Sequence, residues 1–299
     1  MSMRKVVFIP LIISLLLLSS CASQSPMTAN QKGKSASAYI QNKGSDTLVN
    51  LALAWAEQYQ TLHPEIEISV TGGGSGTGFT ALINGTVDIA NASRQIKAEE
   101  VQQAKANGFE PVEVTVANDA IAVIVNPGNS VGQLTLEQVS KIYQGKINNW
   151  QEVGGEDRPI VRLSRETNSG THVYFLETVI RLGDLKNKSF FSADTLLLPS
   201  SEGIFAEVRD NPNAIGYDGL GYVTPEVKMI ALAKKVTDPY VLPSAGTVTD
   251  KSYPISRSLY MYTHGQPSGA IKDYIDWILS TKAQQFTIQL GFVPLTATK

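Results

Sequence analysis

Residues 65–84 have the sequence EIEISVTGGGSGTGFTALIN, and this stretch decides the fold class. Its first part, Glu65 to Thr71, alternates apolar and polar side chains, which predicts a β-strand. The glycine-rich turn Gly72–Gly78 follows, and a helix is predicted over 76–84. A strand that passes through a tight turn directly into a helix is the unit of an α/β protein, so the sequence predicts that class.

The same alternation of short apolar strands and amphipathic helices continues along the chain. Strands are predicted at 38–41, 65–71, 87–90, 112–125, 159–164, 214–217 and 259–262. Helices are predicted at 47–62, 76–84, 97–107, 136–143, 170–181, 203–210, 270–280 and 281–290. The folded part, about 260 residues, exceeds the usual size of a single hydrophobic core, so we expect two lobes.

The amino terminus has the layout of a bacterial lipoprotein signal. Arg4 and Lys5 precede an apolar run, Val6–Leu18, which has the length of a signal peptide and is short for a membrane span. Small residues then precede Cys21, the only cysteine in the chain. A lone thiol suits a lipid anchor and not a disulfide, so we expect residues 1–20 to be removed and Cys21 to carry acyl chains such as palmitate. The alternative is an ordinary signal peptide followed by a chance cysteine.

Residues 21–37 are rich in Ser, Gln, Lys, Ala and Asn and contain almost no large apolar side chains. This composition predicts a flexible tether, which would let the folded part move away from the membrane surface. Together, the two N-terminal segments predict export and anchoring to a bacterial membrane, facing the periplasm or the cell exterior.

The charge of the chain limits its partners. Removal of Arg4 and Lys5 leaves 23 basic against 27 acidic residues, a net charge of −4. A protein that binds a phosphate backbone normally carries a basic excess, so nucleic acid is not expected as a partner. Any site for an anion must be local, made of dipoles and a few cations.

Three turns made of Gly, Ser, Thr, Asn and Asp follow predicted strands and lead into predicted helices. They are Gly44–Thr47, Gly72–Gly78 and Asn168–Thr171. A helix N terminus offers free N–H groups and a partial positive charge, glycine lets the backbone approach an anion, and hydroxyl groups add donors. Each turn alone also fits an ordinary N-cap or a flexible loop. Three of them aimed at one point would bind an oxyanion with little net protein charge.

Two arginines lie beside these turns. Arg94 follows the strand predicted at 87–90, and Arg165 follows the strand predicted at 159–164. A guanidinium group forms a bidentate pair with a phosphate-like anion. A lone arginine is more often a solvated or ion-paired surface residue, so the position beside the turns is what makes these two candidates.

The ordered set of motifs resembles the PstS-type phosphate-binding proteins of bacterial ABC transporters. The set is GSDT (44–47), GGGSGTG (72–78), VDIANASR (87–94), RETNSGT (165–171) and AIGY (214–217). The resemblance extends from about residue 38 to the C terminus. It implies a type II periplasmic-binding-protein fold, in which two lobes are joined by a double hinge crossover and the ligand cleft lies between them.

The resemblance also implies the lobes and the residues that contact phosphate. Lobe one is predicted at 38–118 plus 250–299 and lobe two at 119–249, with the hinge near Asn118-Asp119 and near Gly246–Lys251. The implied contacts are Ser45, Asp46, Thr47, Ser75 and Arg94 in lobe one, and Arg165, Ser169, Gly170 and Thr171 in lobe two. Closure of the lobes would complete the site.

Arg94 departs from the best-known members of the family, which have an acidic residue at this position. There the carboxylate accepts a hydrogen bond from protonated phosphate and so rejects sulfate, which has no proton to donate. Asp46 is the only carboxylate inside a candidate anion turn of this chain. We therefore expect Asp46 to take over the role of acceptor.

The function implied by the resemblance is the binding of inorganic phosphate and its transfer to the membrane permease of an ABC importer, by a monomer that needs no cofactor. Binding of another oxyanion, such as molybdate, tungstate or sulfate, is the closest alternative. A phosphate sensor is a further alternative, because nothing in the sequence excludes a signalling role.

Other classes of function lack their signatures in the sequence. There is no Gly-x-Ser-x-Gly motif of a hydrolase, so no catalytic residue is expected. The glycine-rich turn lacks the Lys-Ser/Thr pair of a P-loop and the spacing of a dinucleotide site. The three histidines, His63, His172 and His264, are far apart in sequence, so no zinc or other metal site is expected.

Overall fold

The structure is a computed structural model that describes residues 38–295. The predicted signal peptide (1–20), the predicted tether (21–37) and the predicted lipidation site Cys21 lie outside the described residues. Within residues 38–295, no helix is long and apolar enough to cross a membrane.

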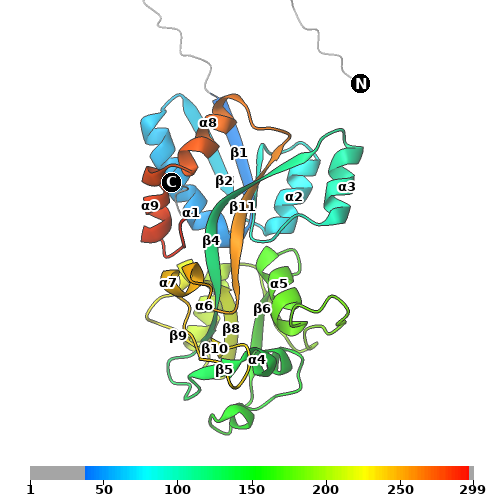
Figure 1. The fold of residues 1–299 in the computed structure, drawn as a ribbon, viewed down its shortest axis with the longest axis vertical. Coiled ribbons are helices and arrows are strands. Elements are labelled where there is room, and N and C mark those ends of the chain that lie inside the picture. The colour runs from blue at the N-terminus through cyan, green and yellow to red at the C-terminus, as the bar shows by residue number, and fades with distance from the viewer. Residues whose placement is uncertain (1–37, 296–299) are drawn as a thin grey trace, which may run out of the picture. The chain divides into compact units, whose positions relative to one another are not determined.

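Two long antiparallel strands, β4 (Pro111–Val125) and β11 (Ser256–His264), pass through the centre of the fold and belong to both lobes (Figure 1). They lie in the middle of one curled sheet with the order β2-β1-β3-β11-β4-β8-β6-β7. The lobes share this sheet, with β1 to β3 in lobe one and β6 to β8 in lobe two.

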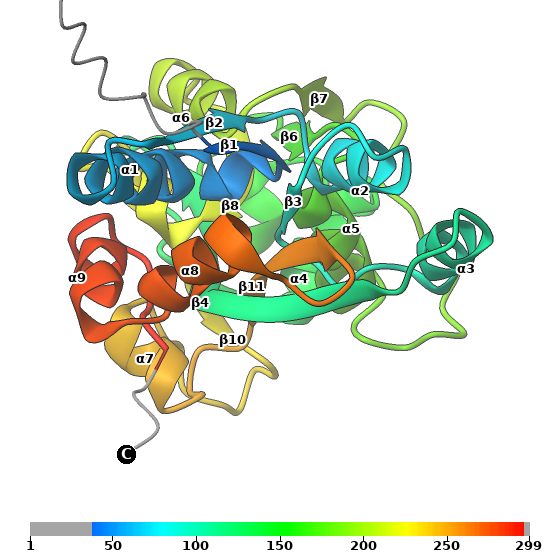
Figure 2. The ribbon, with the colours of Figure 1, turned by 90° about the horizontal axis from the view of Figure 1, so that it is seen from above.

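Lobe one is built on three parallel strands with helices on both faces. The strands are β1 (Ala38–Gly44), β2 (Ile66–Thr71) and β3 (Ile89–Ala92). The helices are α1 (Asp46–Leu62), α2 (Ser75–Ile83), α3 (Ala98–Ala106), α8 (Gly269–Ile278) and α9 (Thr281–Gln289). Figure 2 shows α1, α8 and α9 on one side of the strands and α2 and α3 on the other.

The packing of α2 depends on a glycine. A Cβ at Gly78 would lie 2.8 Å from the Cα of Gly44 and 2.8 Å from the carbonyl oxygen of Lys43. A larger residue there would push α2 away from β1, because backbone atoms cannot yield as a flexible side chain can. Gly78 thus holds the glycine-rich turn close to the end of β1.

Lobe two continues the sheet from the second half of β4. Its strands are β6 (Val161–Arg165), β7 (Leu196–Leu198) and β8 (Ala214–Gly219), with β9 (Lys228–Met229) paired to β4 and a small separate sheet of β5 (Gln133–Thr135) and β10 (Ala231–Ala233). Its helices are α4 (Leu136–Tyr143), α5 (Gly170–Phe175), α6 (Ser201–Asp210) and α7 (Ala245–Thr249), with short helical turns η1 (Trp150–Val153), η2 (Leu176–Ile180) and η3 (Leu220–Tyr222).

The structure confirms the α/β class and every predicted long element. The bounds of α4 match the prediction of 136–143, whereas the single helix predicted at 170–181 is α5 followed by the π-helical turn η2. The strands β5, β7, β9 and β10 and the helix α7 were not predicted. Strands of two or three residues are too short to show a periodic pattern, so periodicity could not find them.

The strands of the hinge cross between the lobes where Arg257 pairs with Asp119 in the antiparallel register. The outward crossing expected at Asn118-Asp119 stays a prediction. On the return path, Tyr253 and Ile255 still pack in the apolar cluster of lobe two with Val123 and Val125. The return crossing predicted near 246–251 likewise stays a prediction.

Candidate anion-binding site

The three predicted anion turns meet in the structure. The hydroxyl oxygens of Thr47 and Thr171, from the first and third turns, are 2.8 Å apart. The backbone N–H of Gly76, in the second turn, donates to the carbonyl oxygen of Asn168 at 2.9 Å. The first two turns belong to lobe one and the third to lobe two, so the lobes touch each other through these turns.

Gly170 makes the closest approach between the second and third turns. A Cβ at Gly170 would collide with the hydroxyl oxygen of Ser75 and would lie 2.6 Å from that of Ser93. Ser75 Oγ also accepts a hydrogen bond from the backbone N–H of Ser93 at 3.0 Å. The start of α5 therefore rests directly on two serine hydroxyls of lobe one.

The hydroxyl groups of Ser45 and Ser169 have different environments, although both residues are N-caps. Ser169 Oγ accepts hydrogen bonds from the N–H groups of Thr171 (3.2 Å) and His172 (3.4 Å), so it caps α5 in the ordinary way. Ser45 Oγ caps nothing and is buried with no partner among residues 38–295. A buried hydroxyl without a partner costs about 1–3 kcal/mol, so Ser45 is suited to bind a ligand at this place.

Arg165, at the end of β6, has an acceptor for each of its five N–H groups. They are Leu198 O (3.4 Å), Ser201 Oγ (2.8 Å), Asp218 Oδ2 (3.1 Å), Asp46 Oδ2 (2.6 Å) and Pro199 O (2.8 Å). Burial opposes the charge of Arg165, but Asp218 and Asp46 more than offset this effect and raise the pKa of its guanidinium. Only the bond to Asp46 reaches the other lobe, while the other four stay in lobe two.

Asp46 is held on both of its carboxylate oxygens. Oδ2 accepts from Arg165, and Oδ1 accepts from the backbone N–H of Gly73 at 2.8 Å. Its backbone carbonyl accepts from the hydroxyl of Tyr222 at 2.5 Å. Asp46 thus links the first turn to the second and to lobe two.

Arg94 lies beside the turns, but its guanidinium is directed elsewhere. Its two terminal nitrogens donate to the Glu100 carboxylate at 2.7 and 2.8 Å, and one of them also donates to Gln95 O at 2.9 Å. The guanidinium also stacks over the ring of Phe79, 4.8 Å from its centroid. None of its hydrogen-bond partners within residues 38–295 belongs to the three turns, so the structure does not bring Arg94 together with the other predicted residues.

Three further charged residues lie in this cluster and were not found from the sequence: Arg257, Asp119 and Asp218. Arg257 Nη2 donates to Asp119 Oδ2 at 3.0 Å and to Thr171 Oγ1 at 3.0 Å. Asp218 directly follows the AIGY motif, at the end of β8. This position next to a motif could have identified Asp218 as a site residue from the sequence. Arg257 belongs to no motif, and only the fold brings it to the turns.

Two guanidinium groups therefore face three carboxylates in the cluster, namely Arg165 and Arg257 against Asp46, Asp119 and Asp218. Burial raises the pKa of Asp119 to about 6, because Arg257 offsets only part of the cost of burying its charge. Burial lowers the pKa of His172 to about 4, so His172 is neutral at neutral pH and adds no positive charge. An anion here would be held mainly by hydrogen-bond donors and not by excess positive charge.

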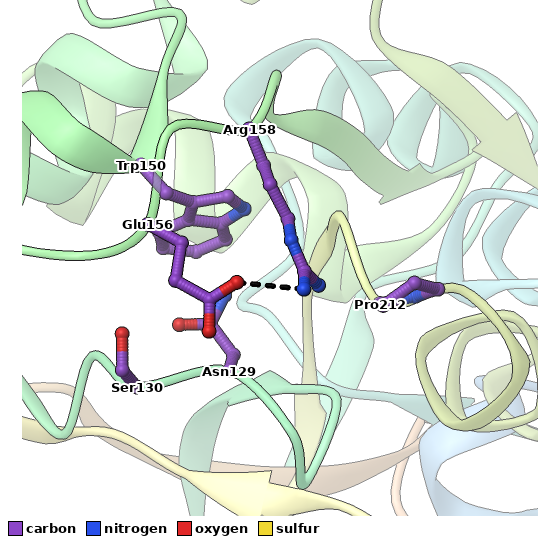
Figure 3. A pocket seen from close by; sticks show the side chains of 6 residues that line it. All are labelled: Asn129, Ser130, Trp150, Glu156, Arg158 and Pro212. Carbon is purple, nitrogen blue, oxygen red and sulfur yellow. Dashed lines mark ion pairs between the residues drawn. The ribbon is translucent and has the colours of Figure 1, made fainter.

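One hollow of the molecule lies apart from the three turns. A small pocket of about 10 Å³ in lobe two is lined by Trp150, Arg158 and Pro212, with the Glu156–Arg158 ion pair across it (Figure 3). It has room for about one water molecule and contains none of the predicted site residues. Between residues 38 and 295, no group of three His, Cys, Asp or Glu side chains is placed to hold a metal ion.

Comparison with known proteins gives matches over most of the chain. A family model described as "PBP superfamily domain" matches residues 29–282. The phosphate-binding protein PstS of Pseudomonas aeruginosa is 33% identical over 284 residues, which cover 89% of this chain and 86% of that protein. PstS of Bacillus subtilis is 32% identical over 265 residues, which cover 88% and 83%. The solved structure of a Clostridium perfringens substrate-binding protein with bound phosphate is 32% identical, with a TM-score of 0.76, and the match covers 86% of this chain and 100% of that one.

Proposed function

We propose that the protein binds inorganic phosphate outside the cytoplasm for delivery to an ABC importer. The premise is that the chain belongs to the PstS phosphate-binding proteins of the PBP superfamily. Such a substrate-binding protein holds and releases its ligand without converting it, so the protein is not an enzyme. The fold is the two-lobe fold of this superfamily.

The observation that carries the proposal is the meeting of hydrogen-bond donors from both lobes at one place. The hydroxyls of Thr47 and Thr171 touch across the lobes, and the hydroxyl of Ser45, which has no partner in the described part of the chain, lies in the same turn as Thr47. Ser75 and Gly170 make a second contact between the lobes. A phosphate that accepts from both sets binds best when the lobes are closed, so it shifts the equilibrium toward the closed form.

Arg165 reaches phosphate only if it gives up one of its present partners. Asp46 is the partner held by the other lobe, so it is the one that moves most easily relative to Arg165. We expect phosphate oxygen to replace the Asp46 carboxylate on Nη2 of Arg165. The freed carboxylate then accepts a hydrogen bond from the protonated oxygen of phosphate. Sulfate cannot form this bond, because it has no proton to donate.

The test of the function is calorimetric titration of the protein with phosphate, sulfate, molybdate and tungstate in separate experiments. We expect saturable binding of phosphate and much weaker binding of the other three anions. Binding of another of these anions with no binding of phosphate would contradict the proposal.

The role of Asp46 has its own test. In Asp46→Asn, we expect the preference for phosphate over sulfate to fall by about tenfold or more, because an amide no longer repels a fully ionised anion. The matched control is Asp157→Asn, an exposed aspartate in lobe two. Sulfate competition that is the same in the Asp46 variant and in the wild type would exclude Asp46 as the acceptor.

We further propose that the protein acts as a monomer, is lipid-anchored through Cys21 and passes phosphate to the permease of its importer. The support is the lipoprotein signal of residues 1–21 and the family to which the chain belongs. Metabolic labelling with palmitate should mark the wild type and not Cys21→Ser. Labelling of both, or of neither, would contradict the anchor without affecting the phosphate site.

A further inference from the structure

Arg257 lies at the point where the two hinge strands cross between the lobes. It is directly opposite Asp119 in the antiparallel pairing of β11 with β4. Its Nε and Nη2 donate to Asp119 Oδ2 at 3.3 and 3.0 Å, and both side chains are almost completely buried. Asp119 Oδ1 also accepts from the backbone N–H of Leu220 at 3.1 Å, so the carboxylate is fixed on both oxygens.

The other N–H groups of Arg257 reach residues of both lobes. Nη2 donates to Thr171 Oγ1 at 3.0 Å in lobe two and approaches Thr47 Oγ1 at 3.4 Å in lobe one. Nη1 donates to the carbonyl oxygen of Ser93 at 2.9 Å, and its second N–H has no other acceptor within residues 38–295. Arg257 thus has one N–H group without an acceptor in the described part of the chain, whereas all five N–H groups of Arg165 have one.

The contacts of Arg257 restrict the roles of the two threonine hydroxyls. A guanidinium group can only donate, so Thr171 Oγ1 accepts from Nη2 at 3.0 Å. The other N–H of Nη2 serves Asp119 at 3.0 Å, so Thr47 Oγ1, at 3.4 Å, has only a weaker, shared contact with this nitrogen. The threonines share one further hydrogen bond, in which either can be the donor. Thr47 Oγ1 also lies 3.5 Å from Asp218 Oδ1, a longer contact than the 2.8 Å to Thr171 Oγ1. If Thr47 donates its one proton to Thr171, the proton of Thr171 stays free, and an oxyanion that can only accept will favour this arrangement.

From these contacts we infer that Arg257 is a positioning residue for the anion: it holds the Thr171 hydroxyl against that of Thr47, so that Thr171 can donate to the anion, and joins this pair to the hinge through Asp119. The inference rests on the proposed function, because it concerns the same site. Since Arg257 projects from the hinge strand, it meets both hydroxyls only when the lobes are closed. Anion binding and hinge closure are therefore coupled through this one side chain.

A simpler role would be that Arg257 only neutralises the buried charge of Asp119. Lysine distinguishes the two roles, because it supplies the charge but lacks the planar fork that donates in several directions at once. If neutralisation were the whole role, Arg257→Lys would bind phosphate as the wild type does. If the fork positions the hydroxyls, the charge of lysine does not restore binding.

The experiment is a double-mutant cycle in phosphate titrations with Arg257→Lys, Thr171→Val and the double variant. We expect Arg257→Lys to weaken phosphate binding by about 10- to 100-fold. We also expect Thr171→Val to weaken binding much more in the wild type than in the Arg257→Lys background, since the hydroxyl is no longer oriented there. The control is Arg158→Lys, a half-exposed arginine of lobe two paired with Glu156, which should bind as the wild type does.

Wild-type affinity in Arg257→Lys, or equal effects of Thr171→Val in both backgrounds, would overturn the inference. If Arg257→Lys does not fold, the double variant Arg257→Leu/Asp119→Asn removes both charges and serves in its place, with the same expected loss and the same overturning result. Absence of phosphate binding in the wild type would instead contradict the proposed function. The failures of the two proposals are therefore distinguishable.

Discussion

Arg165 and Arg257 are two buried arginines in one cluster, and they differ in what their donors reach. Each is paired with a fully buried aspartate, Arg165 with Asp218 and Arg257 with Asp119. Four of the five N–H groups of Arg165 donate to acceptors within lobe two, most of them around β7 and α6. Arg257 projects from the hinge and reaches lobe one and lobe two at the same time.

The two arginines therefore have different roles. Arg165 builds part of the site, and Arg257 couples the site to closure of the lobes. Arg165 stabilises the wall of lobe two and meets lobe one only through Asp46. Arg257 makes two bonds to Asp119 and one to Ser93 O, and its contacts with Thr47 and Thr171 are the ones that depend on how the lobes meet. We therefore expect loss of Arg165 to affect stability and binding together, and loss of the Arg257 fork to affect chiefly binding.

The largest effect is expected for Arg165→Met. Asp218 would remain buried without its cation, and loss of one partner of a buried ion pair costs about 3–5 kcal/mol. Phosphate binding should also be lost. Urea unfolding followed by circular dichroism measures the first quantity and calorimetry the second. A variant as stable as the wild type would show that Arg165 does not hold lobe two together, and the contrast with Arg257 would fail.

An intermediate effect is expected on the pH dependence of stability in Asp119→Asn. The pKa of Asp119 is raised to about 6 in the folded protein, so the folded state binds this proton more readily than the unfolded state. This group therefore adds stability as the pH falls from about 6 toward 4. His172 acts in the opposite direction, because its lowered pKa of about 4 makes the protein lose stability over the same range.

In Asp119→Asn the gain from Asp119 is absent, while His172 and the other titrating groups act as in the wild type. Between pH 7 and pH 4, the free energy of unfolding should fall by up to about 3 kcal/mol more in this variant than in the wild type. Arg257, Asp218, Tyr174 and Tyr253 also face Asp119, and none of them is changed. Urea unfolding at the two pH values measures the difference, with Asp157→Asn as the exposed control. Parallel curves for variant and wild type would mean that Asp119 does not titrate in this window.

The smallest effect is expected for Arg94→Gln. The guanidinium of Arg94 is bound to Glu100 and Gln95, so its loss should weaken phosphate binding by no more than a few-fold. Calorimetric titration beside Arg257→Lys makes the comparison direct. A loss for Arg94→Gln as large as that for Arg257→Lys would mean that Arg94 turns toward the anion, as the family resemblance implies.

The sequence predicted much of the site because its parts are local. Ser45, Ser75 and Thr171 each lie in a turn between a strand and a helix, and such a turn is visible within a few residues. Arg257 and Asp119 could not be predicted in this way. Arg257 contacts Thr171 across 86 positions and Asp119 across 138 positions of the chain, so only the path of the two hinge strands brings them together.

The acceptors that bind the N–H groups of Arg165 could not be predicted from the sequence either. Its position before the third turn was evident, but Leu198, Pro199 and Ser201 belong to a segment that includes the short strand β7, which has no recognisable period. The sequence therefore indicated which arginine is near the anion turns and not how many of its donors are free.

The most direct test of the central claim is a crystal structure of the protein with phosphate. We predict one phosphate ion between the lobes, within hydrogen-bond distance of the Ser45 hydroxyl, the Thr171 hydroxyl and a guanidinium nitrogen of Arg165, with Arg257 still bridging Thr47 and Asp119. Phosphate bound away from the three turns, or contacting residues of only one lobe in a closed molecule, would contradict the account.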